Sequence, residues 1–120
     1  AYQMTIKTAT LIEILNQSIK LRGETIAKFS KEMLISPAHE LEWSDVVFKA
    51  AAELEVHSII KDALTKPDTK ATLESITEHI TDRVRSMAQF PSKSTSAVAN
   101  LMAQHRLAAW AGLLDIIKYL

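Results

Sequence analysis

The sequence of 120 residues predicts an all-α fold, an antiparallel four-helix bundle with a long first helix. Apolar residues recur at spacings of three and four along most of the chain, which places them on one face of a helix. There are only two glycines, whereas tight hairpin turns need residues that accept a positive φ. Segments around Pro37, Pro67 and Pro91 separate four periodic stretches. Short loops between consecutive helices favour an up-down-up-down bundle.

The first predicted helix covers residues 5–35. Its apolar stripe keeps its phase across Gly23, so we expect one long helix rather than a helix kinked there. An interior glycine costs about 1 kcal/mol relative to alanine, so we expect Gly23 to permit the close approach of a neighbouring backbone. Pro37 disfavours helical geometry at Ser36 and ends the helix. The stripe consists of Ile12, Leu15, Ile19, Arg22, Ile26, Phe29 and Met33.

The second helix runs to about residue 65. It starts either with Ser36 as cap and Pro37 in its first turn, or at Ser44 after a separate turn over 39–43. The third helix runs to about residue 89, with Asp68 or Thr69 as its cap. It is amphipathic, with one buried stripe and an otherwise polar surface. This stripe consists of Leu73, Ile76, Ile80, Val84 and Met87.

The fourth helix, about residues 95–120, carries two apolar stripes instead of one. The first consists of Val98, Met102, His105, Ala109, Gly112 and Ile116, and the second of Ala103, Leu107, Trp110, Leu114 and Ile117. The small residues Ala108 and Gly112, four apart, favour close packing on a neighbour. A helix of an ordinary bundle buries a single face, so the second stripe is unexpected.

Surplus apolar surface on the fourth helix and on the start of the first predicts homo-oligomerisation, as a two-fold dimer. Trp110 is the expected anchor of the interface. The alternative is that the fourth helix is the central helix of one compact bundle, surrounded by the other three. The predicted interface residues are Leu107, Trp110, Leu114 and Ile117, with Leu11 and Ile14 on the first helix.

The composition excludes several classes of function. A chain without Cys has no thiolate nucleophile, disulfide or Cys-ligated metal. Phosphate-binding loops need clustered glycines, which are absent. Fourteen basic and fourteen acidic residues balance, so no overall charge favours nucleic acid or anionic lipid. We therefore expect no cofactor and no enzymatic activity, and a cytoplasmic protein with no membrane span.

Residues 1–120 form one predicted helical domain. Ala1-Tyr2-Gln3 precede Met4, and we expect them to be a remnant ahead of the natural start.

The four histidines predict no metal site. His39-Glu40 begins like a zinc-protease helix, but Trp43 stands where the second histidine is required. Glu53 and His57, four apart, are expected to form a surface pair.

Two polar residues lie within predicted apolar stripes, Arg22 on the first helix and His105 on the fourth. A buried guanidinium needs a carboxylate or carbonyl partner, and Asp115 is one candidate. The less favoured alternative function is a ligand or anion pocket around Arg22 and His105. The favoured interpretation of both residues is structural.

Nucleic-acid binding by a small helical regulator is the second alternative. Residues 47–64 resemble a helix-turn-helix only superficially, since Glu55 occupies the glycine position of the turn. The basic residues that would contact phosphates are Arg83, Arg85, Lys93 and Arg106. The favoured prediction remains a non-enzymatic interaction or adaptor module that self-associates through its fourth helix.

Overall fold

A computed structural model of the chain describes residues 5–35, 40–91 and 93–120, and all regular structure in these ranges is helical. The helices are α1 (Ile6–Ile35), α2 (Glu40–Thr65), α3 (Leu73–Gln89) and α4 (Ala97–Lys118). The predicted all-α bundle with a long first helix is therefore confirmed, and α1 continues through Gly23 without interruption. The predicted cap at Ser36-Pro37 lies outside the described residues.

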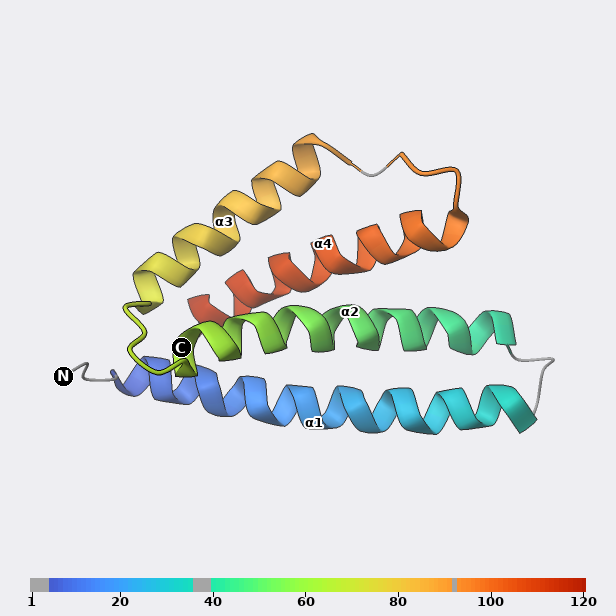
Figure 1. The fold of residues 1–120 in the computed structure, drawn as a ribbon, viewed down its shortest axis with the longest axis horizontal. Helices are drawn as coiled ribbons and strands as arrows, with labels where there is room; N and C mark the ends of the chain where they lie inside the picture. The colour runs from blue at the N-terminus through green and yellow to red at the C-terminus, as the bar shows by residue number, and fades with distance from the viewer. Residues whose placement is uncertain (1–4, 36–39, 92) are drawn as a thin grey trace.

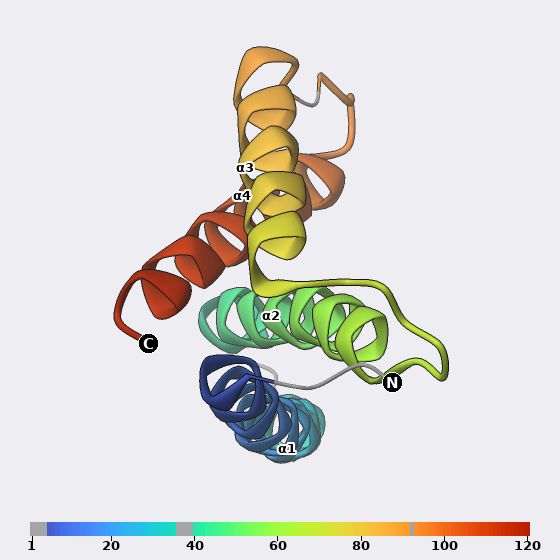
Figure 2. The same ribbon diagram turned by 90° about the vertical axis from the view of Figure 1, so that its left-hand side faces the viewer.

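The helices run alternately in opposite directions, and their spatial order is α1, α2, α4, α3 (Figure 1). In an up-down-up-down bundle α2 and α4 run in the same direction and lie diagonally opposite. Here they pack directly on each other, while α1 and α4 barely touch. Figure 2 shows α3 and α4 on the same side of the α1–α2 pair, with α3 rising away from it. With the helices in the order α1, α2, α4, α3, a closed bundle would bring α3 against α1. The two do not pack on each other, so the bundle is open on that side.

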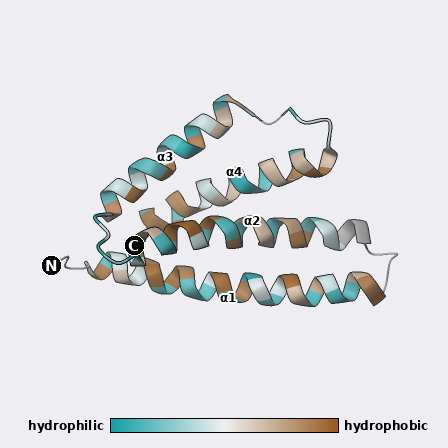
Figure 3. Ribbon diagram, viewed as in Figure 1, coloured by the Kyte–Doolittle hydropathy of each residue, from teal (hydrophilic) through white to brown (hydrophobic). Residues whose placement is uncertain are grey.

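The apolar core lies at one end of the molecule, where all four helices meet. We call this the four-helix end. It contains Leu11 and Leu15 from α1, Val56, Ile60 and Leu64 from α2, Ile76 and Ile80 from α3, and Ala109, Trp110 and Leu113 from α4. Figure 3 shows α3 largely hydrophilic along its visible side, as expected for a helix that buries one stripe. The predicted α3 stripe is confirmed, since Ile76 and Ile80 are buried and its other members pack against the core.

The two stripes of α4 face two different neighbours in the same chain. On one side, His105 forms a hydrogen bond with Asp45 of α2, and Ala109 and Gly112 face α1 and α2. On the other side, Trp110 lies beneath α3, with the Arg83 guanidinium 5.3 Å from its ring centre and the His79 ring edge-on. A helix between two others buries two faces, so the second stripe requires no second chain. The central-helix alternative fits two of the three neighbours that it named, since α4 packs on α2 and α3 but barely touches α1.

The ends of the later helices differ slightly from the sequence prediction. Thr72 caps α3 in a capping box with Ser75, three to four residues after the predicted caps Asp68 and Thr69. Thr69 instead donates its hydroxyl to the carbonyl of Ala63, near the end of α2. Ser96 caps α4, within one residue of the predicted start at about residue 95. A run of cap-forming residues identifies a helix start but does not fix which of them is the cap.

The close approach predicted at the glycines is wrong. A Cβ atom added to Gly23 or Gly112 would have no heavy atom of a neighbouring element within 4 Å. Both glycines have ordinary helical φ values. At Gly112 the missing side chain leaves an open groove against α1 and α2 instead of a tight helix contact.

Candidate functional site

The predicted interface divides into residues that the chain buries itself and residues that remain accessible. Trp110 is 2% exposed and Leu11 is fully buried, so neither can contact a second chain in this conformation. Their assignment to an interface is wrong, because α3 lies over Trp110 and Leu11 belongs to the core where the four helices meet. Half-buried positions remain on both helices: Ile14, Leu107, Leu114 and Ile117.

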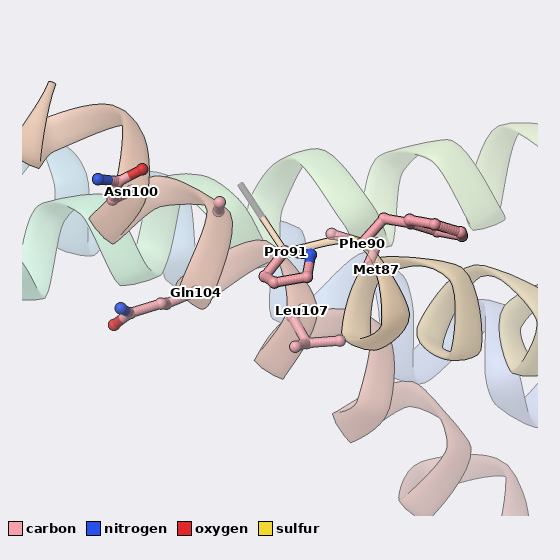
Figure 4. Close-up of a pocket in the computed structure, with 7 residues that line it drawn as sticks. Met87, Phe90, Pro91, Asn100, Gln104 and Leu107 are labelled. Atoms are coloured by element: carbon pink, nitrogen blue, oxygen red, sulfur yellow. The ribbon is translucent and has the colours of Figure 1, made fainter. Parts of the chain in front are cut away.

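Leu107 lines an apolar groove between the end of α3 and the first half of α4, where the two helices diverge (Figure 4). We call it the mouth groove. Its volume is about 280 Å³. Phe90, one of its lining residues, is 74% exposed. The lining residues are Met87, Phe90 and Pro91 from the α3 end, and Asn100, Ala103, Gln104 and Leu107 from α4.

A cluster of polar residues interrupts the apolar contact between α1 and α2. The Ser18 hydroxyl lies 2.7 Å from Nδ1 of His57, which is only 5% exposed. One turn further along, Arg22 Nε donates to a carboxylate oxygen of Glu53 over 2.9 Å. Both partners of this ion pair are partly buried. We call these four residues the polar seam; each of its two contacts joins α1 to α2.

Burial controls the charge of His57. Desolvation lowers the pKa of its imidazole below 6.5, because the charged form loses its hydration. The Glu53 carboxylate acts in the opposite direction, and the Arg22 guanidinium adds to the lowering. His57 is therefore neutral at pH 7, with a single ring proton. The predicted surface pair of Glu53 and His57 is wrong, since His57 is buried and its hydrogen bond goes to Ser18.

The polar seam opens onto a second groove, of about 450 Å³, between α1, α2 and α4. We call it the side groove. Arg22, Lys49 and His57 line its polar part. Its apolar wall comes from Ile14, Ala108, Ala109, Gly112 and Ile116. Arg22 therefore faces a cavity, as the anion-pocket alternative supposed.

His105 does not share that cavity. Its Nε2 lies 2.8 Å from a carboxylate oxygen of Asp45, which joins α4 to the first half of α2. Arg22 and His105 thus form two separate interhelical contacts, and the prediction of one polar core site containing both is wrong. Asp115 is exposed and does not pair with Arg22, whose partner is Glu53.

The seam resembles the pairs used in nucleophilic catalysis only in its residue types. A serine activated by histidine also needs N–H donors for the developing oxyanion. Ser18 and His57 lie in the interiors of long helices, where backbone N–H groups bond to the carbonyls four residues before them. The Ser18–His57 contact therefore acts as an interhelical hydrogen bond.

Three of the four basic residues considered for nucleic acid have partners within the chain. Arg83 stacks over Trp110, Arg85 lies 3.6 Å from Asp82, and Arg106 donates to Glu55 over 3.0 Å. Lys93 lies exposed in the loop before α4. Phosphate binding by the three arginines would compete with these contacts.

Within ranges 5–35, 40–91 and 93–120, no cluster of three or more His, Asp or Glu side chains is arranged to hold a metal ion. No helix in the same ranges is long and apolar enough to cross a bilayer. Comparisons with protein-family models, curated proteins and solved structures find no match to this chain.

The Ser18–His57 contact of the polar seam is not among the predictions from the sequence, although a signal for it exists. His57 stands seven residues after Ala50 and seven before Leu64, both of which are buried. Ser18 stands in the same relation to the buried Leu11. A spacing of seven returns to nearly the same side of a helix, so both polar residues belong to the packed faces of α1 and α2.

Proposed function

We propose that this chain is a non-enzymatic helical interaction module that self-associates, with the mouth groove and its exposed rim as the contact surface. A cytoplasmic location belongs to the same proposal. The surface differs from the one expected from the sequence, because the apolar stripes of α4 are largely occupied by α2 and α3. Leu107 belongs both to the interface predicted from the sequence and to the surface proposed here, since it lies in the second stripe of α4 and lines the mouth groove.

The observation that carries the proposal is the area that the monomer leaves uncovered. The chain exposes 8054 Å², whereas a compact protein of its mass of 13.4 kDa exposes about 6,500 Å². Its radius of gyration is 16.1 Å, compared with about 14 Å for a compact domain of this length. The surplus area of one chain is about 1,500 Å², which exceeds the share of about 800 Å² that each partner contributes to an interface of standard size.

The mouth groove is favoured as the contact because an exposed aromatic side chain forms part of its wall. Phe90 stands at the C-terminal end of α3 and is 74% exposed. Aromatic side chains next to a concave apolar surface are typical anchors of protein interfaces. A net charge of zero imposes no overall repulsion between two copies. A second copy is therefore the partner that we propose.

Sedimentation velocity over the micromolar range tests this function. We expect the mass of the wild-type chain to rise toward twice 13.4 kDa with concentration. Phe90→Asp places a charge beside the groove and is expected to return the chain to the monomer without loss of helix content. Leu21→Asp is the matched control, since Leu21 is 53% exposed on α1 and lines no part of the mouth groove.

A wild-type chain that sediments as a monomer throughout would contradict self-association. A dimer that persists in Phe90→Asp but dissociates in Leu21→Asp would place the interface on α1 and contradict the role of the mouth groove.

A further inference from the structure

The side groove combines donors that have no partner in the chain with an apolar wall. Arg22 uses only Nε on Glu53, so its two terminal nitrogens have no hydrogen-bond partner among the described residues. Nε2 of His57 likewise has no partner there. No described side-chain nitrogen or oxygen is both unpaired and fully buried, so Nε2 keeps some accessible surface. Because His57 lines this groove and is otherwise buried, that surface faces the groove.

The charge balance in the groove favours an anion. Arg22 and Lys49 are positive, Glu53 is negative, and His57 is neutral at pH 7 because burial lowers its pKa. The sum is one positive charge. The Arg22 fork is suited to a planar carboxylate, which accepts two parallel N–H bonds from terminal guanidinium nitrogens. When Ser18 donates to Nδ1, the proton of His57 is on Nε2 and is available to the same anion.

The wall opposite the charged groups suits an apolar chain. Ala108 and Gly112, one turn apart on α4, present little side-chain bulk, and Ile14 and Ile116 flank them. Gly112 has open space where a Cβ atom would stand. The volume of about 450 Å³ lies within the usual range for pockets that hold small organic ligands.

We infer that the side groove binds an aliphatic monocarboxylate, with its carboxylate on Arg22 and Nε2 of His57 and its chain along Ala108 and Gly112. Lys49, at the exposed edge of α2, adds to the attraction for the anion. A monocarboxylate matches the single positive charge, and its chain matches the apolar wall. This site is independent of self-association, because none of its lining residues lies in the mouth groove.

Calorimetric titration with octanoate, below the concentration at which it forms micelles, tests the site. We expect saturable binding to the wild-type chain. Gly112→Leu fills the groove and is expected to weaken binding at least tenfold, while leaving the four-helix end intact. Gly23→Leu is the matched control, since Gly23 also has open space above it but lines no part of the groove. Its affinity for octanoate should equal that of the wild-type chain.

Further titrations separate the carboxylate from the chain as the source of affinity. Octanol and inorganic phosphate should each bind at least tenfold more weakly than octanoate. Lys49→Gln should weaken octanoate binding severalfold without unfolding the protein, because Lys49 is exposed and has no ion-pair partner among the described residues. Three results would each overturn the inference: no octanoate binding by the wild-type chain, unchanged binding by Gly112→Leu, or equal affinity for octanol and octanoate.

Discussion

The four-helix end and the α1–α2 hairpin beyond it are built from the same helices but are held together differently. At the four-helix end, residues from all four helices exclude water, and Leu15, Ile80 and Leu113 are completely buried. Beyond it, α1 packs mainly on α2, the apolar residues Ile26, Phe29 and Met33 are only half-buried, and the Arg22–Glu53 ion pair joins the two helices. Burial scales with the number of neighbours, so stability is concentrated at the first region and the second is free to open locally.

The largest effect on the free energy of unfolding is expected when the same substitution, isoleucine to alanine, is made in each of the two regions. Ile60 is 1% exposed at the four-helix end, whereas Ile26 is half-buried on the hairpin. Ile60→Ala should lower the free energy of unfolding by about 2–5 kcal/mol, because it leaves a cavity. Ile26→Ala should cost about 1 kcal/mol, since water fills the space. Urea unfolding of both variants measures the difference, and equal losses would contradict the contrast between the regions.

The ion pair of the polar seam should show the next largest effect. Arg22→Met leaves the Glu53 carboxylate, 18% exposed, without its partner. We expect a loss of about 1–2 kcal/mol, below the cost of breaking a fully buried pair. The double variant Arg22→Met, Glu53→Leu should recover most of this loss, because no unpaired charge remains. A double variant whose loss equals the sum of the single losses would contradict a direct coupling between the two side chains.

Alanine substitutions at the two helix glycines should raise the free energy of unfolding, by less than the losses above. Gly23→Ala should raise the free energy of unfolding by about 1 kcal/mol, because alanine is the better helix former and its Cβ enters open space. Gly112→Ala should have the same effect for the same reason. Thermal unfolding measures both variants. A loss of stability in either would indicate a close contact at that glycine.

The pH dependence of stability is the most subtle test of the polar seam. The pKa of His57 is lowered on folding, so between its folded value and 6.5 the unfolded chain binds more protons. The contribution of neutral His57 is complete above pH 6.5 and is lost as the pH falls below that value. Urea unfolding at pH 7.5 and 5.5 should therefore show a larger acid-induced loss for the wild-type chain than for His57→Gln. An identical loss in the two proteins would contradict the burial of a neutral imidazole.

The sequence predicts the helices well because their apolar spacing is a local property. The α3 stripe and the uninterrupted α1 follow directly from positions three and four apart. The pairing of helices is not local. Both stripes of α4 were correctly recognised, but the sequence does not tell whether the second stripe contacts α3 or another molecule. Trp110 was therefore assigned to an interface, although α3 covers it.

The candidate sites were harder to predict because each combines residues from several helices. Arg22 stood out as a charge in an apolar stripe, but its partner Glu53 lies 31 residues away. The spacing of Glu53 and His57 suggested a pair on one helix, whereas the hydrogen bond of His57 crosses to α1. The mouth groove depends on the angle between α3 and α4, which no local pattern specifies.

Hydrogen exchange at two protein concentrations tests most directly whether a second copy covers the mouth groove. At the higher concentration we expect backbone amides of residues 87–90 and 97–107 to exchange more slowly, because association covers the mouth groove. Amides of residues 56–64, at the four-helix end, should exchange at the same rate at both concentrations and serve as the internal reference. Equal rates around the mouth groove at both concentrations would contradict self-association through this surface.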